Sequence, residues 1–124
     1  MTKTGNTLYR SFANAFRGIR QAFTERNMKI HLSIGTAALT LAVCTGITET
    51  EWMILVMNIA AVIAAEIFNT AVEHLSDKVC ADYDETIKTV KDISAAGVVV
   101  MAFCSLITGS MIFIPRLGYL LSSF

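Results

Sequence analysis

The chain has 124 residues, of which 54% are hydrophobic, and its mean hydropathy is +0.57. This is more apolar than an ordinary soluble domain, so the composition indicates a single membrane-embedded domain over residues 1–124. Ten basic and ten acidic residues leave no net charge, which gives no reason to expect a nucleic-acid partner.

The first segment, about residues 6–26, has the pattern of an amphipathic helix lying on a membrane surface. Its apolar residues recur at helical spacing, and they are Leu8, Phe12, Ala15, Phe16, Ile19, Ala22 and Phe23. Six of the ten basic residues precede position 30, where Glu25 is the only acid. We therefore expect this segment to favour an anionic inner leaflet.

Three apolar runs, about residues 30–47, 52–75 and 93–114, are long enough to cross a membrane. A helix needs about 20 residues to cross about 30 Å of hydrocarbon. A loop over 46–51 and a charged connection over 76–92 separate the runs, and Pro115 is expected to end the third. The pattern predicts an all-α membrane protein with a surface helix and three transmembrane helices.

The distribution of Lys and Arg predicts the orientation. The N-terminal segment has six such residues and the 76–92 connection has three, whereas the 46–51 loop has none. Short flanks rich in Lys and Arg stay in the cytoplasm. The sequence therefore predicts a multi-pass protein of a bacterial inner membrane, with its N-terminus and its polar site facing the cytoplasm and its C-terminus outside.

The second span carries a row of polar side chains on one face. At about 100° per residue, Glu66, Asn69, Glu73 and Asp77 fall within less than a quarter-turn. A carboxylate inside a bilayer costs roughly 3 kcal/mol on insertion scales, so such residues usually mark a functional site. Glu66 is the deepest and has apolar neighbours, which suits a general base working near neutral pH. The alternative is a protonated Glu66 that packs against another helix.

Other polar residues are candidates for a phosphate or cation site. Glu25 and Glu73 could share one hard cation such as Mg²⁺, although Glu25 by itself would more often be a solvated turn residue. Asn69 could orient a carboxylate or a phosphate, or could simply join helices. Lys91 and Asp92 are expected at the start of the third span, where helix N–H groups attract phosphate; alone they would more often be an interfacial anchor and an N-cap.

Two further features narrow the chemistry. The chain contains neither GxxxxGK[ST] nor GxGxxG, so any nucleotide must be held by side chains and helix ends. His31 and His74 are interpreted as interfacial hydrogen-bonding residues rather than ligands. A rival function is a small oligomeric ion or proton pathway in which Glu66 and Glu73 relay protons. It does not explain why Asn69 and the other candidates occur together.

The segments that carry these residues resemble the small prokaryotic membrane lipid kinases, the diacylglycerol kinase and undecaprenol kinase family. Residues 65–73, AEIFNTAVE, are similar to the signature E-x-x-N-[ST]-A-[IV]-E, with Asp77 at the right distance. Residues 91–96, KDISAA, match A-K-D-x-x-[SA]-A except that Val90 stands at its first position. Residues 12–18 and 24–27 resemble the N-terminal half of the family, whereas Asp84-Glu85 departs from its usual His-Pro or His-Glu.

This resemblance implies a homotrimer with sites between protomers, and an enzyme that transfers phosphate from MgATP to the hydroxyl of a membrane lipid. It implies that Glu66 is the catalytic base, that Glu25 and Glu73 bind the metal, and that Asn69 organises the site beside Glu66. It implies a nucleotide site of charged residues: Arg10, Arg17, Glu25, Glu73, Asp77, Lys91 and Asp92. Residues 24–31, TERNMKIH, look more like the undecaprenol kinase branch, so undecaprenol is favoured over diacylglycerol as acceptor.

Overall fold

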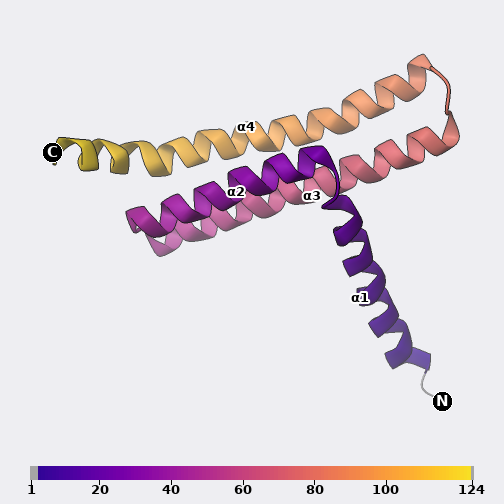
Figure 1. Ribbon diagram of the computed structural model, residues 1–124, viewed down its shortest axis with the longest axis horizontal. Coiled ribbons are helices and arrows are strands. Elements are labelled where there is room, and N and C mark those ends of the chain that lie inside the picture. Colours follow the sequence, from indigo (N-terminus) through magenta and orange to yellow (C-terminus); the bar gives the residue numbers. More distant parts are fainter. Residues whose placement is uncertain (1–2, 124) are drawn as a thin grey trace.

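The computed structural model describes residues 3–123, and the side chains of 7–123, as four helices joined by short loops. These are α1 (Lys3–Ala22), α2 (Arg26–Thr45), α3 (Glu49–Val79) and α4 (Glu85–Ser122). Helices α2, α3 and α4 lie side by side, and α1 extends away from them (Figure 1). Each of α2, α3 and α4 is long and apolar enough to cross a membrane, which confirms the predicted all-α fold with three spans.

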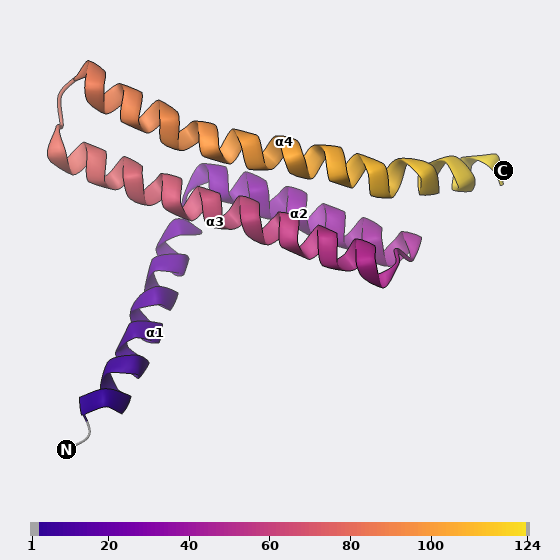
Figure 2. The ribbon, with the colours of Figure 1, turned by 180° about the vertical axis from the view of Figure 1, so that it is seen from behind.

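Helix α1 leaves much of its apolar face without a protein partner. Leu8, Phe12 and Phe16 are each more than half exposed. The view from behind also shows α1 pointing away from the three long helices (Figure 2). An amphipathic helix with an uncovered apolar face is suited to lie in a membrane interface, as the sequence predicted. It ends at Ala22, four residues before the end of the predicted segment.

The loop between α2 and α3 is shorter than the 46–51 loop expected from the sequence. Gly46 ends α2 in the left-handed conformation, with φ 62°, and its N–H donates to the carbonyl of Ala42. Thr48 then begins a capping box: its N–H donates to Glu51 Oε2 at 2.7 Å, and the Glu51 N–H donates to Thr48 Oγ1 at 3.3 Å. Residues 49–51 are therefore the first turn of α3.

Pro115 does not end the last helix, so that expectation was wrong. Proline lacks one backbone N–H, which weakens the helix locally, yet α4 continues to Ser122. Arg116 donates to Glu51 Oε1 at 2.8 Å, to Glu51 Oε2 at 2.6 Å and to the carbonyl of Ile112 at 3.0 Å. This bidentate pair joins the end of α4 to the start of α3. Both residues lie just outside the apolar runs of their helices. Chiefly through the Arg116 hydrogen bond, the pair lowers the pKa of Glu51 from 4.5 to about 2.

The charged 76–92 connection is mostly helical. Helix α3 continues to Val79 and α4 begins at Glu85. The start of α4 is capped by Asp84, whose Oδ1 accepts from the Ile87 N–H at 2.9 Å. Lys91 therefore lies about two turns inside α4. The expectation that Lys91 and its neighbour Asp92 stand at a helix N-terminus was wrong.

The apolar core and the polar residues occupy different halves of α3. Leu55, in the first half, packs in a buried cluster with Ala42, Ile112 and Phe113. The buried polar residues of α3 lie in its second half. Most other apolar side chains of the long helices are exposed, because side chains that face lipid need no protein cover. The core thus fixes the helices at one end and leaves the polar groups together at the other.

Candidate functional site

The polar face of α3 contains two almost fully buried side chains. Glu66 and Asn69 are each 3% exposed, a helical turn apart. Asn69 Nδ2 donates to Glu73 Oε1 at 3.2 Å, so these two residues are joined on the face of α3 that also carries Glu66. Asn69 Oδ1 is buried and has no hydrogen-bond partner among the residues that the structure describes. A buried oxygen without a partner is costly, which indicates that a ligand or solvent atom completes it.

The start of α2 faces this part of α3 through two close contacts between a histidine and a carboxylate. His31 Nε2 lies 3.9 Å from Glu66 Oε2, and His74 Nε2 lies 3.5 Å from Glu25 Oε1. Glu25 is the N-cap residue of α2, but its side chain makes no capping hydrogen bond. Its carboxylate is therefore available to other partners. Both contacts arise because α2 runs antiparallel to α3, which places the start of one beside the second half of the other (Figure 1).

Sequence reasoning missed the contribution of His31. A lone histidine at a membrane boundary gave little signal, and its partner is 35 positions away in the chain. A geometric signal was available. When two antiparallel spans are joined by a short loop, position 31 on the first comes to lie beside the region of position 66 on the second. The structure thus adds one side chain to the predicted group around Glu66.

A second polar contact joins α3 to α4 near their connecting loop. Lys91 Nζ donates to Asp77 Oδ1 at 2.9 Å. This hydrogen bond raises the pKa of Lys91, which lies before the apolar run of α4. Because its pKa is raised, the Lys91 side chain is charged at neutral pH. Asp92, also a predicted site residue, instead accepts from Lys88 Nζ at 2.6 Å, one turn back on the same helix. The structure therefore brings Asp77 and Lys91 together but turns Asp92 to a different partner.

Two predicted site residues lie apart from these groups. Arg10 and Arg17 are exposed on α1, which extends away from α2, α3 and α4 (Figures 1 and 2). Within a single chain, these two guanidinium groups are carried by the one helix that stands outside the bundle.

The carboxylates suit a hard cation that retains other ligands. No group of three or more His, Cys, Asp or Glu positioned to hold a metal occurs in the described part of the chain. Mg²⁺ in phosphate-transfer sites needs only one or two carboxylates, because phosphate oxygens and water complete its shell. Among the described residues, Glu73 accepts a hydrogen bond from Asn69, and Glu25 lies beside His74. The pair is compatible with such a site.

The fold and this site define a small multi-pass membrane protein in which a cluster of carboxylate side chains lies on one membrane-spanning helix. The sequence model described as "Prokaryotic diacylglycerol kinase" matches residues 13–113. The chain belongs to this family.

Two relatives are similar to this protein over most of the chain. It is 36% identical over 113 residues to "Undecaprenol kinase" of Bacillus subtilis, an alignment covering 90% of this chain and 92% of that protein. It is 33% identical over 109 residues to "Diacylglycerol kinase" of Synechocystis, covering 86% of this chain and 62% of that protein. The chain is thus a prokaryotic membrane lipid kinase, as the resemblance predicted, and neither relative supports the ion-pathway alternative.

Proposed function

We propose that this protein transfers the γ-phosphate of ATP to the hydroxyl of a membrane lipid at the cytoplasmic face of a bacterial inner membrane. The observation that carries this proposal is the pair Glu66 and Asn69, each 3% exposed on a membrane-spanning helix. The buried Asn69 Oδ1 has no partner among the described residues and needs a hydrogen donor. A bound substrate or a water molecule that accompanies it can supply this donor, and membership of the family supplies the reaction.

Glu66 is the proposed general base. The acceptor hydroxyl gives its proton to Glu66 while its oxygen attacks the γ-phosphorus, and the bond to the leaving ADP breaks. Asn69 donates to Glu73 and so holds that carboxylate beside the base; because the single proton of the hydroxyl goes to Glu66, Asn69 Oδ1 takes its hydrogen bond from a water molecule or another donor of the bound ligands. His31 lies beside Glu66 and helps fix the position of the carboxylate. Positioning and charge neutralisation account for most of the catalysis in reactions of this type.

Glu25 and Glu73 are the proposed Mg²⁺ ligands. Glu25 comes from the start of α2 and Glu73 from the second half of α3, so the cation site depends on how these two helices pack. When bound, the cation would neutralise charge on the phosphate oxygens. The hydrogen bond from Asn69 holds Glu73 in a fixed orientation next to the base.

The proposed nucleotide site extends from these carboxylates to Asp77, Lys91 and Asp92 near the α3–α4 loop. Lys91 supplies a point charge for the β- and γ-phosphates, and Asp77 holds it in place. Arg10 and Arg17 are assigned to the nucleotide or the lipid headgroup. Helix α1 extends away from α2, α3 and α4 of its own chain. Arg10 and Arg17 would therefore reach the nucleotide site of a neighbouring protomer if α1 lay against that protomer. This arrangement favours the proposed homotrimer with sites between protomers.

Undecaprenol is the proposed acceptor. The similarity to the Bacillus subtilis undecaprenol kinase covers 92% of that protein, whereas the similarity to the Synechocystis diacylglycerol kinase covers 62%. Hydrophobic discrimination is small, about 1–3 kcal/mol for a methylene-sized difference, so both lipids should react. We expect a higher kcat/KM for undecaprenol.

The test is transfer of radiolabel from ATP by the purified protein to a panel of lipid alcohols at matched surface concentration in one detergent. Transfer that requires Mg²⁺ and is fastest to undecaprenol is the expected result. Faster phosphorylation of diacylglycerol would reverse the choice of acceptor. No transfer to any lipid alcohol would contradict the proposed function itself.

A further inference from the structure

A cleft of about 450 Å³ opens where the α1–α2 turn meets the first two turns of α2. Its lining consists of six exposed residues, which are Thr24, Arg26, Lys29, Ile30, Ser33 and Ile34. At about 100° per residue, Arg26, Lys29 and Ser33 fall within about 60° of one another. The cleft therefore lies along one face of α2.

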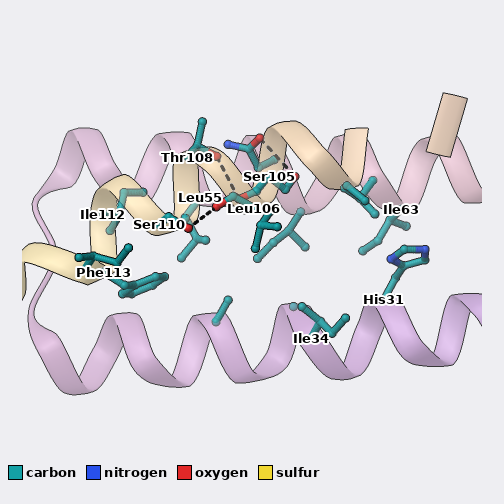
Figure 3. Close-up of a pocket in the computed structure, with 18 residues that line it drawn as sticks. His31, Ile34, Leu55, Ile63, Ser105, Leu106, Thr108, Ser110, Ile112 and Phe113 are labelled. Atoms are coloured by element: carbon teal, nitrogen blue, oxygen red, sulfur yellow. Dashed lines mark hydrogen bonds between the residues drawn. The ribbon is translucent and has the colours of Figure 1, made fainter. Parts of the chain in front are cut away.

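This face of α2 points away from the candidate site. Met28, which is fully buried, lies about 160° around the helix from Arg26. Figure 3 shows His31 pointing from α2 toward the apolar groove between α2, α3 and α4, which it lines. Ile34 lines both the cleft and this groove and so marks the boundary between the two sides. The cleft is thus separate from the proposed catalytic group.

The two basic side chains of the cleft have no protein partner. Among the described residues, neither Arg26 nor Lys29 forms an ion pair or a side-chain hydrogen bond. The two hydroxyl groups already donate: Thr24 Oγ1 to the carbonyl of Gln21 at 2.7 Å, and Ser33 Oγ to the carbonyl of Lys29 at 2.8 Å. The side-chain donors that remain are both cationic, which favours an anionic ligand.

The lining changes from charged to apolar along the helix. Arg26 is the first residue of α2, and Lys29 directly precedes the apolar run. Ile30 and Ile34, 47% and 62% exposed, lie deeper in the span. The distance from Arg26 to Ile34 along the axis is about 12 Å at 1.5 Å per residue. A ligand with an anionic head and an apolar tail covers both parts, whereas a soluble anion leaves the isoleucines uncovered.

We propose that this cleft binds an anionic phospholipid of the cytoplasmic leaflet, with its phosphate at Arg26 and Lys29 and its chains along Ile30 and Ile34. Basic pockets at the cytoplasmic ends of membrane helices bind anionic headgroups. A guanidinium group can donate to two phosphate oxygens at once, and the ammonium group adds a point charge. The lipid bound here is neither the acceptor nor the product of the kinase, so the inference does not depend on the proposed mechanism.

The experiment uses brominated phospholipids, because bromine quenches tryptophan fluorescence only at close range. The chain has one tryptophan, Trp52. The Ile30→Trp variant in a Trp52→Phe background therefore places the reporter in the cleft. The protein is reconstituted in phosphatidylcholine with increasing amounts of brominated phosphatidylglycerol, and quenching gives the association constant of the anionic lipid relative to phosphatidylcholine. Trp52 of the wild type, near the start of α3, serves as the reference position outside the cleft.

We expect phosphatidylglycerol to associate more strongly than phosphatidylcholine at the Ile30→Trp reporter. Arg26→Gln and Lys29→Gln should each lower its relative association constant about fivefold, the effect of one interfacial charge. Lys78→Gln is the matched control, because Lys78 is an exposed basic residue in the last turn of α3 and lies outside the cleft. Equal association of the two lipids, or an equal loss in Lys78→Gln, would overturn the inference.

Two controls test other anions as the occupant. Inorganic phosphate, compared with chloride at the same ionic strength, should not relieve quenching by phosphatidylglycerol; relief would assign the cleft to a soluble anion. The kcat and the ATP KM of Arg26→Gln and Lys29→Gln in phosphatidylcholine alone should match the wild type. A loss in either variant would place these side chains in the nucleotide site and overturn the inference.

Melting temperature provides a second measurement that needs no introduced tryptophan. A ligand that binds only the folded state raises the melting temperature. Phosphatidylglycerol should therefore raise it more than phosphatidylcholine does in the wild type and in Lys78→Gln, but not in the double variant Arg26→Gln/Lys29→Gln. Equal shifts in all three proteins would overturn the inference even if Ile30→Trp failed to fold. A wild-type protein that shows these lipid effects but no lipid phosphorylation would contradict the proposed function and leave this site in place.

Discussion

Replacing Glu66 by glutamine removes the proposed base while preserving its shape. Glutamine retains the size and the hydrogen-bonding capacity of the side chain beside His31 and Asn69 but cannot take a proton at this position. General-base catalysis typically contributes about 10²- to 10⁴-fold. Because Glu66 is only 3% exposed, water has little access to replace it, and we expect turnover to fall by roughly 10²-fold or more. At about 1.36 kcal/mol per tenfold, this is a barrier increase of about 2.7 kcal/mol or more.

The assay is kcat at saturating lipid and MgATP, with ATP affinity and thermal stability measured on the same preparations. ATP affinity should change little, and stability should hold or increase, because a buried carboxylate is costly. Glu49→Gln is the matched control, since Glu49 is an exposed residue in the first turn of the same helix. If Glu66→Gln keeps more than about a tenth of the wild-type turnover, the carboxylate has a packing role and the proposed mechanism is wrong.

The remaining predictions concern metal binding, topology and acid stability. Glu25→Gln and Glu73→Gln should each raise the Mg²⁺ concentration needed for half-maximal activity without changing the oligomer, and wild-type Mg²⁺ dependence in either variant would remove that residue from the ligand set. A cysteine introduced at Thr48 should react with an impermeant thiol reagent in whole cells and one at Thr86 should not; the reverse pattern would refute the orientation. Because the folded pKa of Glu51 is lowered to about 2 from 4.5, its pairing contributes stability above pH 4.5 and loses it as the pH falls toward 2. Melting temperature between pH 6 and pH 3 should therefore decline more in the wild type than in Glu51→Gln, and equal slopes would show that the pair is not responsible.

Local periodicity was enough to predict the helices and the main polar group. Hydropathy identified three membrane-spanning helices because their apolar residues face lipid or each other whatever their partners are. The 3.6-residue repeat placed Glu66, Asn69 and Glu73 on one face, and the structure shows two of them buried and the third bonded to Asn69. The start of α4 was not predicted correctly: it was expected near Lys91 and Asp92, although Asp84 three residues before Ile87 is an ordinary capping arrangement.

Contacts between helices could not be predicted in the same way, because they depend on the register in which the helices pack. His31 meets Glu66 only because α2 turns back along α3 at that register, and nothing within either helix specifies the match. Pro115 predicted a helix end from local chemistry, but Arg116 binds Glu51, 65 positions earlier, and α4 continues. The sequence by itself determined which faces are polar and which segments cross the membrane, since both follow from repeats within one helix. The tertiary structure alone decided which polar groups meet and where a groove opens beside them, since both depend on how three separate helices are placed against one another.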